Sequence, residues 1–332
     1  MYKKLINVAL FSTMLSLSAD AFSRVELEET KQNAHTEESD SEAEWDVLNP
    51  PFNLNEVTIN TDETTWSSLD VSPNGEKFVF DMLGDLYISP IAGGEATSLT
   101  QDFAWNIQPT FSPDGKKIAF VTYSSGGPII RLIDLVTGKG RLVADFKGVN
   151  SAPAWSPDGT KIAYSSSQHG SPDIFVYDML TKKHKRISTH YSIETEPSWS
   201  PRGESFLFTS NRSGKPQIYS YSAIDESASR VTFEEDESAN ASYNAICNKI
   251  VMVQKGGKIV VMDEDSGRIT PLTIAEFDES PSFSPNGDMV LYKSEEQFEA
   301  ALMVSSSDGR VKTRLKLVSG DVREPAWSPL NQ

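Results

Sequence analysis

The stretch PAWSPDGTKIAYS, residues 153–165, decides the fold of this chain of 332 residues. An apolar segment leads into the turn Ser-Pro-Asp-Gly and a second apolar segment leads out of it. Proline presets φ in such a turn, and Asp-Gly accepts the remaining backbone angles at low cost. The stretch therefore predicts two antiparallel strands, and residues 173–177 and 185–187 predict the third and fourth strands of the same sheet.

The same pattern recurs along most of the chain. A Ser-Pro pair followed by a glycine turn begins at Ser72, Ser112, Ser156, Ser200 and Ser284, and a last Ser-Pro pair begins at Ser328. The spacings are 40, 44, 44, 84 and 44 residues, and the long one spans a degenerate copy near Asn244. A period of roughly 40 to 45 residues is typical of β-propeller blades.

The strand count predicts six blades. Second, third and fourth strands each occur six times, whereas residues 66–71 and 325–328 could each supply the innermost strand of the first blade. We therefore predict an all-β fold, a six-bladed β-propeller of four-stranded antiparallel blades, with the ring closed by the C-terminal strand at 325–328. Closure in this way removes an open sheet edge. A seven-bladed ring is the alternative.

The N-terminal residues indicate export. Residues 1–21 combine two lysines, a short apolar run and Ala-Asp-Ala, which is the pattern of a cleavable signal peptide. Residues 22–64 hold twelve acidic and two basic residues, and they predict a disordered leader. The propeller domain is expected at 65–332. No other apolar run is long enough to span a bilayer, so we expect a periplasmic monomer without membrane insertion after signal cleavage.

Composition and motifs argue against several classes of function. The net charge of −17 would repel nucleic acid, and the single cysteine, Cys247, allows no intrachain disulfide. No nucleophile elbow, phosphate-binding glycine loop or metal-ligand spacing of histidines occurs. We therefore predict a protein that is not an enzyme, with no catalytic residue, no metal site and no cofactor.

The repeats resemble the WD40-like propeller repeat of the TolB family, at residues 195–199 (TEPSW), 208–219 (FTSNRSGKPQIY) and 278–287 (DESPSFSPNG). The likeness covers roughly residues 105–332. It implies a periplasmic propeller of the Tol-Pal envelope system whose channel mouth receives the lipoprotein Pal, with Ala152 and Thr195 at matching positions. The first repeat, at 69–100, is also similar to propellers attached to amidohydrolases and tricorn-type peptidases.

One constellation of polar residues is a candidate binding site. Each first strand starts at the rim of the central channel, so the residues near these starts should crowd one mouth, where propellers place their binding loops. The predicted partner-binding residues include five carboxylates and one cation: Gln108, Asn150, Ala152, Glu194, Thr195, Glu196, Asp278, Glu279, Arg323 and Glu324.

The leading hypothesis is an exported, noncatalytic propeller that binds an envelope protein or peptide, such as a Pal-like lipoprotein, at this acidic mouth. One alternative is a propeller glycosidase or lyase that uses two channel carboxylates as acid and base. Another is an accessory propeller that acts with a separately encoded hydrolase. A solvated rim without a partner is the simplest explanation of the carboxylates.

Overall fold

The computed structural model describes residues 47–49, 67–124, 126–233, 236–244, 249–274, 277–296, 299–315 and 324–329. The predicted signal peptide at 1–21, most of the leader at 22–64, Cys247 and Arg323 lie outside the described residues. The described residues contain 24 strands and no helix.

The strands fall into six sheets, which we number as blades 1 to 6 in chain order. The innermost strands are β1 (Leu69–Val71), β5 (Asn106–Phe111), β9 (Asn150–Trp155), β13 (Glu194–Trp199), β17 (Ser238–Tyr243) and β21 (Glu279–Phe283). The second strands are β2 (Lys77–Met82), β6 (Lys117–Thr122), β10 (Lys161–Ser166), β14 (Ser205–Ser210), β18 (Lys249–Gln254) and β22 (Met289–Glu296).

The outer half of each blade is built in the same order. The third strands are β3 (Asp85–Pro90), β7 (Ile129–Asp134), β11 (Asp173–Asp178), β15 (Gln217–Ser222), β19 (Lys258–Asp263) and β23 (Glu299–Ser306). The outermost strands are β4 (Thr97–Ser98), β8 (Gly140–Ala144), β12 (His184–Arg186), β16 (Ser227–Arg230), β20 (Ile269–Pro271) and β24 (Lys312–Leu315).

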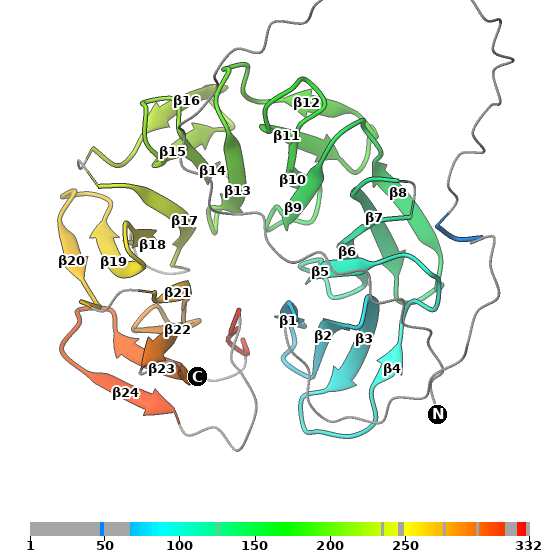
Figure 1. Cartoon of the computed structure of the whole chain (residues 1–332), viewed down its shortest axis with the longest axis horizontal. Coiled ribbons are helices and arrows are strands. Elements are labelled where there is room, and N and C mark those ends of the chain that lie inside the picture. Colours follow the sequence, from blue (N-terminus) through cyan, green and yellow to red (C-terminus); the bar gives the residue numbers. More distant parts are fainter. Residues whose placement is uncertain are drawn as a thin grey trace, which may run out of the picture. The chain divides into compact units, whose positions relative to one another are not determined.

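Every sheet has four antiparallel strands in sequence order, and the six sheets surround a central axis with their innermost strands facing it (Figure 1). The predicted six-bladed β-propeller is therefore confirmed. Inner strands run from one end of the ring, the channel mouth, to the Ser-Pro turns at the other end, the turn end. The outermost strands end at the channel mouth, where the loops that leave them lead to the next innermost strand.

The Ser-Pro turns are held by their own side chains. In blade 2, Ser112 Oγ donates to Asp114 Oδ1 at 2.6 Å and accepts the backbone N–H of Lys117 at 2.9 Å. Gly115 closes the turn at a φ of 67°, which glycine adopts without a Cβ clash. Ser156 with Asp158 and Ser284 with Asn286 repeat the arrangement, which explains why this motif marks the blade period.

Neighbouring blades pack through apolar side chains. Tyr164, Phe206 and Phe208 are at most 1 % exposed. The indole Nε1 of Trp155 donates to the Thr110 carbonyl of the preceding blade at 3.3 Å, and Trp199 donates to the Ala154 carbonyl at 3.1 Å. The tryptophans at this repeat position therefore connect blades both by packing and by a hydrogen bond.

The closing strand differs from the prediction. The innermost place of blade 1 is taken by β1, which pairs with Phe78–Phe80 of β2, rather than by a C-terminal strand. Residues 325–328 form no strand, but Trp327 Nε1 donates to the Ser282 carbonyl of blade 6 at 3.0 Å. This segment thus lies against blade 6 as Trp155 and Trp199 lie against their preceding blades, while the earlier segment of the chain supplies the paired strand.

Candidate functional site

At the channel mouth, each inner strand from blade 2 to blade 6 starts next to a buried polar side chain. These side chains are at most 1 % exposed: Asn106, Asn150, Glu194, Ser238 and Asp278. Buried polar groups require hydrogen-bond partners inside the protein. Asn106, Asn150 and Glu194 bond to the loops around them, so they form an inner layer that positions the loops.

Asn150 shows what this layer does. Its Nδ2 donates to the carbonyls of Pro128 and Phe146 at 3.0 and 2.8 Å, and Ser166 Oγ donates to its Oδ1 at 2.7 Å. The amide thus connects the loop before its own strand and the second strand of blade 3 to the loop before the third strand of blade 2. Its hydrogen-bonding groups are used within the ring and connect blade 3 to blade 2.

Glu194 is the charged counterpart of Asn150 in blade 4. Its Oε1 accepts from Ser192 Oγ at 3.1 Å, from Ser210 Oγ at 3.0 Å and from the Arg212 guanidinium, whose Nε lies 3.1 Å away. The Arg212 guanidinium also lies over the Tyr219 ring at 4.6 Å. Asn150, Glu194 and Asp278 are therefore internal residues, and a docking partner could reach them only indirectly.

The third residue of each inner strand from blade 2 to blade 5 adopts a left-handed backbone conformation inside a β-bulge. The same conformation occurs at the matching positions later in the chain, and φ lies between 41° and 58° at Gln108, Ala152, Glu196, Asn240, Ser280 and Glu324. A bulge re-aims the strand and frees an N–H group from the sheet. Several of these freed groups bond to the neighbouring blade.

These bonds connect consecutive blades around the channel. The N–H of Gln108 donates to Asp81 Oδ2 at 3.1 Å, and the N–H of Ala152 donates to Gln108 Oε1 at 3.4 Å. The N–H of Asn240 donates to Glu196 Oε2 at 2.9 Å, and Thr209 Oγ1 donates to the same oxygen at 2.8 Å. Two predicted binding residues, Gln108 and Glu196, therefore also stabilise the ring.

The remaining predicted site residues lie nearer to solvent. Ala152 and Thr195 are half-buried, whereas Glu196 and Glu324 are exposed. Glu279 is half-buried and pairs with Lys293, whose Nζ lies 2.9 Å from Glu279 Oε1. The described mouth thus contains exposed carboxylates together with one lysine that sequence reasoning did not identify.

Asp81 is a further carboxylate that the sequence did not reveal. It lies in β2, is 4 % exposed, and accepts N–H groups from Ser68 and Gln108 at 3.3 and 3.1 Å. Burial raises its pKa to about 6 against the effect of these two hydrogen bonds, and the negative charge of Glu324 raises it further. The other blades have an uncharged residue or a lysine at this position of the second strand. A carboxylate in one blade only was therefore the signal by which sequence reasoning could have identified Asp81.

The mouth also carries exposed apolar side chains at one repeat position, directly before the buried polar residues. We call this set the apolar collar, and its members are 56, 50, 52 and 67 % exposed: Trp105, Val149, Ile193 and Phe277. Sequence reasoning missed the set, although an apolar residue precedes the inner-strand position in four repeats. Scattered exposed apolar residues are ordinary, but these four share one repeat position at the mouth, which makes them a candidate interaction surface.

The collar is rigidly supported. Val149 donates its N–H to Ser167 Oγ at 2.8 Å and accepts the N–H of Ser167 at 2.9 Å. Ile193 is held in the same way by Asn211, at 2.8 and 3.3 Å. The Trp105 ring packs against Gly84, where a Cβ would lie 2.8 Å from Trp105 Cε3. Such preorganisation lowers the entropic cost of binding.

Two properties of the described residues concern other classes of site. No group of three or more His, Cys, Asp and Glu side chains among them is arranged to hold a metal ion. Within the same residues, no helix is long and apolar enough to cross a bilayer.

Comparison with known proteins gives a consistent family. The sequence model of the TolB β-propeller domain matches residues 82–331. The "Tol-Pal system protein TolB" of Xylella fastidiosa strain M12 is 60 % identical over 228 residues, which cover 67 % of this chain and 52 % of that protein. The chain therefore spans about half the length of the curated relatives it matches.

Solved structures agree with the fold. The crystal structure of TolB from Acinetobacter baumannii is 36 % identical, with a TM-score of 0.63, and the match covers 79 % of this chain and 66 % of that one. An oligogalacturonate lyase matches with the same TM-score at 15 % identity, over 76 % of this chain and 79 % of the lyase. The lyase likeness concerns the fold alone.

Proposed function

Because the chain belongs to the TolB β-propeller domain family, we propose that it is an exported, noncatalytic propeller of a Tol-Pal-related system that binds an envelope protein at the channel mouth. The observation that carries the proposal is the apolar collar around a mouth with exposed carboxylates. The relatives are named as Tol-Pal system proteins, which favours an envelope partner such as a Pal-like lipoprotein.

The mouth favours a partner loop with an apolar centre and basic or amide-bearing flanks. Trp105, Val149 and Ile193 lie at the same position in three consecutive blades and offer the apolar contact. Glu196 and Glu324 are exposed beside it and would attract positive charge. Apolar anchors contribute most of the affinity at such interfaces, and rim charges act mainly on the association rate and its salt dependence.

Site-specific crosslinking in intact cells tests the proposal. A photoreactive amino acid at Ile193 should capture one envelope protein, and the same amino acid at Leu180 should not. Leu180 is the matched control because it is an 88 % exposed apolar residue at the turn end. Ile193→Asp should weaken binding of the purified captured protein at least tenfold, and Leu180→Asp should leave it unchanged.

Charge reversal provides the second arm. Glu196→Lys combined with Glu324→Lys should abolish pull-down of the same partner at low salt. Equal capture from Ile193 and Leu180, or unchanged pull-down by the charge-reversed variant, would contradict the proposal.

The enzymatic alternative rests on Asp81, whose raised pKa and neighbouring Glu324 charge are features of carboxylate catalysis. We favour a structural function for Asp81, because its Oδ2 accepts the N–H of Ser68 within blade 1 and the N–H of Gln108 from blade 2, and the second bond holds the two blades together. Turnover of an oligosaccharide or oligouronide that is lost in Asp81→Asn would reverse this choice.

A further inference from the structure

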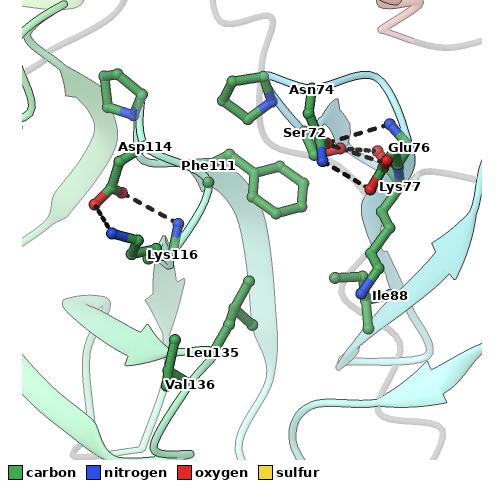
Figure 2. A pocket seen from close by; sticks show the side chains of 13 residues that line it. Ser72, Asn74, Glu76, Lys77, Ile88, Phe111, Asp114, Lys116, Leu135 and Val136 are labelled. Carbon is green, nitrogen blue, oxygen red and sulfur yellow. Dashed lines mark hydrogen bonds and ion pairs between the residues drawn. The ribbon is translucent and has the colours of Figure 1, made fainter.

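A pocket opens between blades 1 and 2 at the turn end, which is the end of the ring opposite the apolar collar. Its volume is about 470 Å³, within the range of roughly 300 to 1,000 Å³ that is common for small-ligand sites. Figure 2 shows its walls: the turn of blade 1 with Lys77 on one side, and the turn of blade 2 with Asp114 and Lys116 on the other.

The floor of the pocket is apolar. Phe111 lies at its centre, only 6 % exposed, and Ile88, Leu135 and Val136 surround the space below it (Figure 2). Phe111 occupies the repeat position that is tryptophan in blades 3 and 4. The pocket therefore lies at an interface whose repeat position carries a phenyl ring in place of an indole.

The charged side chains on the two walls differ in the hydrogen bonds and ion pairs that they form within the protein. Glu76 accepts from Asn74 Nδ2 at 2.8 Å. Asp114 accepts from Ser112 Oγ at 2.6 Å and from the backbone N–H of Lys116 at 3.1 Å, and the Lys116 ammonium lies 4.0 Å away. Both carboxylates remain charged, and the hydrogen bond from Ser112 lowers the pKa of Asp114. Lys77 and Lys116 balance these two negative charges in the lining of the pocket.

Lys77 is differently placed. Its side chain runs along the wall so that Nζ lies beside Ile88 (Figure 2). No hydrogen bond or ion pair of this ammonium is formed within the described part of the chain. A cation next to an apolar floor is complementary to a ligand that joins an apolar group to a carboxylate.

We propose that this pocket binds the C-terminal residue of a polypeptide whose last side chain is apolar. The side chain would pack on Phe111, Ile88 and Leu135, and the terminal carboxylate would pair with Lys77. A polypeptide end supplies both groups on adjacent atoms, and the open side of the pocket at the exposed Val136 gives the preceding residues a way out. The site is separate from the channel mouth.

A fluorescently labelled Gly-Gly-Phe peptide with a free carboxylate is the probe, and its C-terminal amide is the comparison. Fluorescence polarisation with the full chain should show at least tenfold tighter binding of the free acid. Lys77→Glu should remove this preference. Lys161→Glu is the matched control, because Lys161 occupies the same repeat position in blade 3, and this variant should keep the preference.

Three results would overturn the proposal: equal binding of acid and amide, equal loss in the two lysine variants, or binding of 3-phenylpropionate as tight as that of the peptide. The last result would assign the pocket to free small acids. Lys77→Glu should still capture the partner of the collar, so failure here and failure of the proposed function are distinguishable.

Discussion

The interface between blades 1 and 2 and the interface between blades 2 and 3 use the same repeat positions for different contacts. Between blades 2 and 3, Trp155 fills the contact and its indole donates to the Thr110 carbonyl. Between blades 1 and 2, Phe111 replaces the tryptophan and Asp70 replaces the threonine. Asp70 Oδ2 accepts the Phe111 N–H at 2.7 Å and Thr110 Oγ1 at 3.2 Å.

The comparison shows that a repeat position fixes where a residue lies in the ring but does not fix which contact the residue makes with the neighbouring blade. The tryptophan interface depends on packing and on the indole hydrogen bond. The phenylalanine interface depends on a carboxylate of raised pKa and retains the 470 Å³ pocket. We therefore expect the two interfaces to respond differently to truncation and to pH.

The largest expected effect is at the tryptophan interface. Trp155→Ala should lower the free energy of unfolding by about 3–5 kcal/mol, because a 9 % exposed aromatic side chain leaves a cavity. Trp155→Phe retains most of the packing and should cost about 1 kcal/mol for the lost hydrogen bond. Urea unfolding measures both values. Equal losses in the two variants would show that packing is not what stabilises this interface.

The intermediate effect is at the phenylalanine interface and depends on pH. Burial raises the pKa of Asp70 to about 6, although three hydrogen bonds oppose the shift. The folded protein then binds this proton more tightly than the unfolded chain, so stability falls as the pH rises from about 4 to about 6. Asp70→Asn should remove a pH-dependent fall of roughly 1–2 kcal/mol in the free energy of unfolding. This value is smaller than the full pKa shift would give, because Asp70 is only half-buried.

Thermal unfolding at pH 4.5 and 7 checks the Asp70 prediction. Asp134→Asn is the control, because hydrogen bonds from Thr137 lower the pKa of this turn carboxylate, so its contribution is lost only as the pH falls. Asp134→Asn should leave the fall in stability between pH 4 and 6 unchanged. In Asp70→Asn part of this fall should remain, because the pKa of Asp81 is also about 6. An unaltered pH profile in Asp70→Asn would refute the assignment.

The smallest effect is expected at the outer edge of the interface between blades 3 and 4. Lys185 Nζ lies 2.6 Å from Glu226 Oε1, but the side chains are 52 and 67 % exposed. Exposed ion pairs contribute little, so Glu226→Gln should change the free energy of unfolding by less than about 0.5 kcal/mol. A loss as large as that of Trp155→Ala would mean that the blades are held at their outer edges.

Much of the fold could be predicted from local chemistry. The Ser-Pro turns require particular residues at fixed positions, and their spacing predicts the blades before any contact is known. Blade number followed from counting second, third and fourth strands. The closing strand could not be predicted by counting, because residues 66–71 and 325–328 carry equivalent patterns and only pairing with β2 distinguishes them.

The candidate site was predictable only in outline. Topology places the predicted loops at the mouth, but burial separates Asn150, Glu194 and Asp278 from the exposed Glu196 and Glu324. A polar residue at a strand start has the same sequence signature whether it faces solvent or a ring of backbone carbonyls. The collar was missed for the converse reason, since apolar residues beside strands are usually assigned to the core.

The sequence by itself determined the repeat, the turn chemistry and the number of blades, because these depend on residues close together along the chain. Only the tertiary structure decided which carboxylates are buried, which apolar side chains remain exposed and where one interface stays open. These properties depend on how neighbouring blades fill the space between them, and each blade meets the next through residues about 44 positions apart.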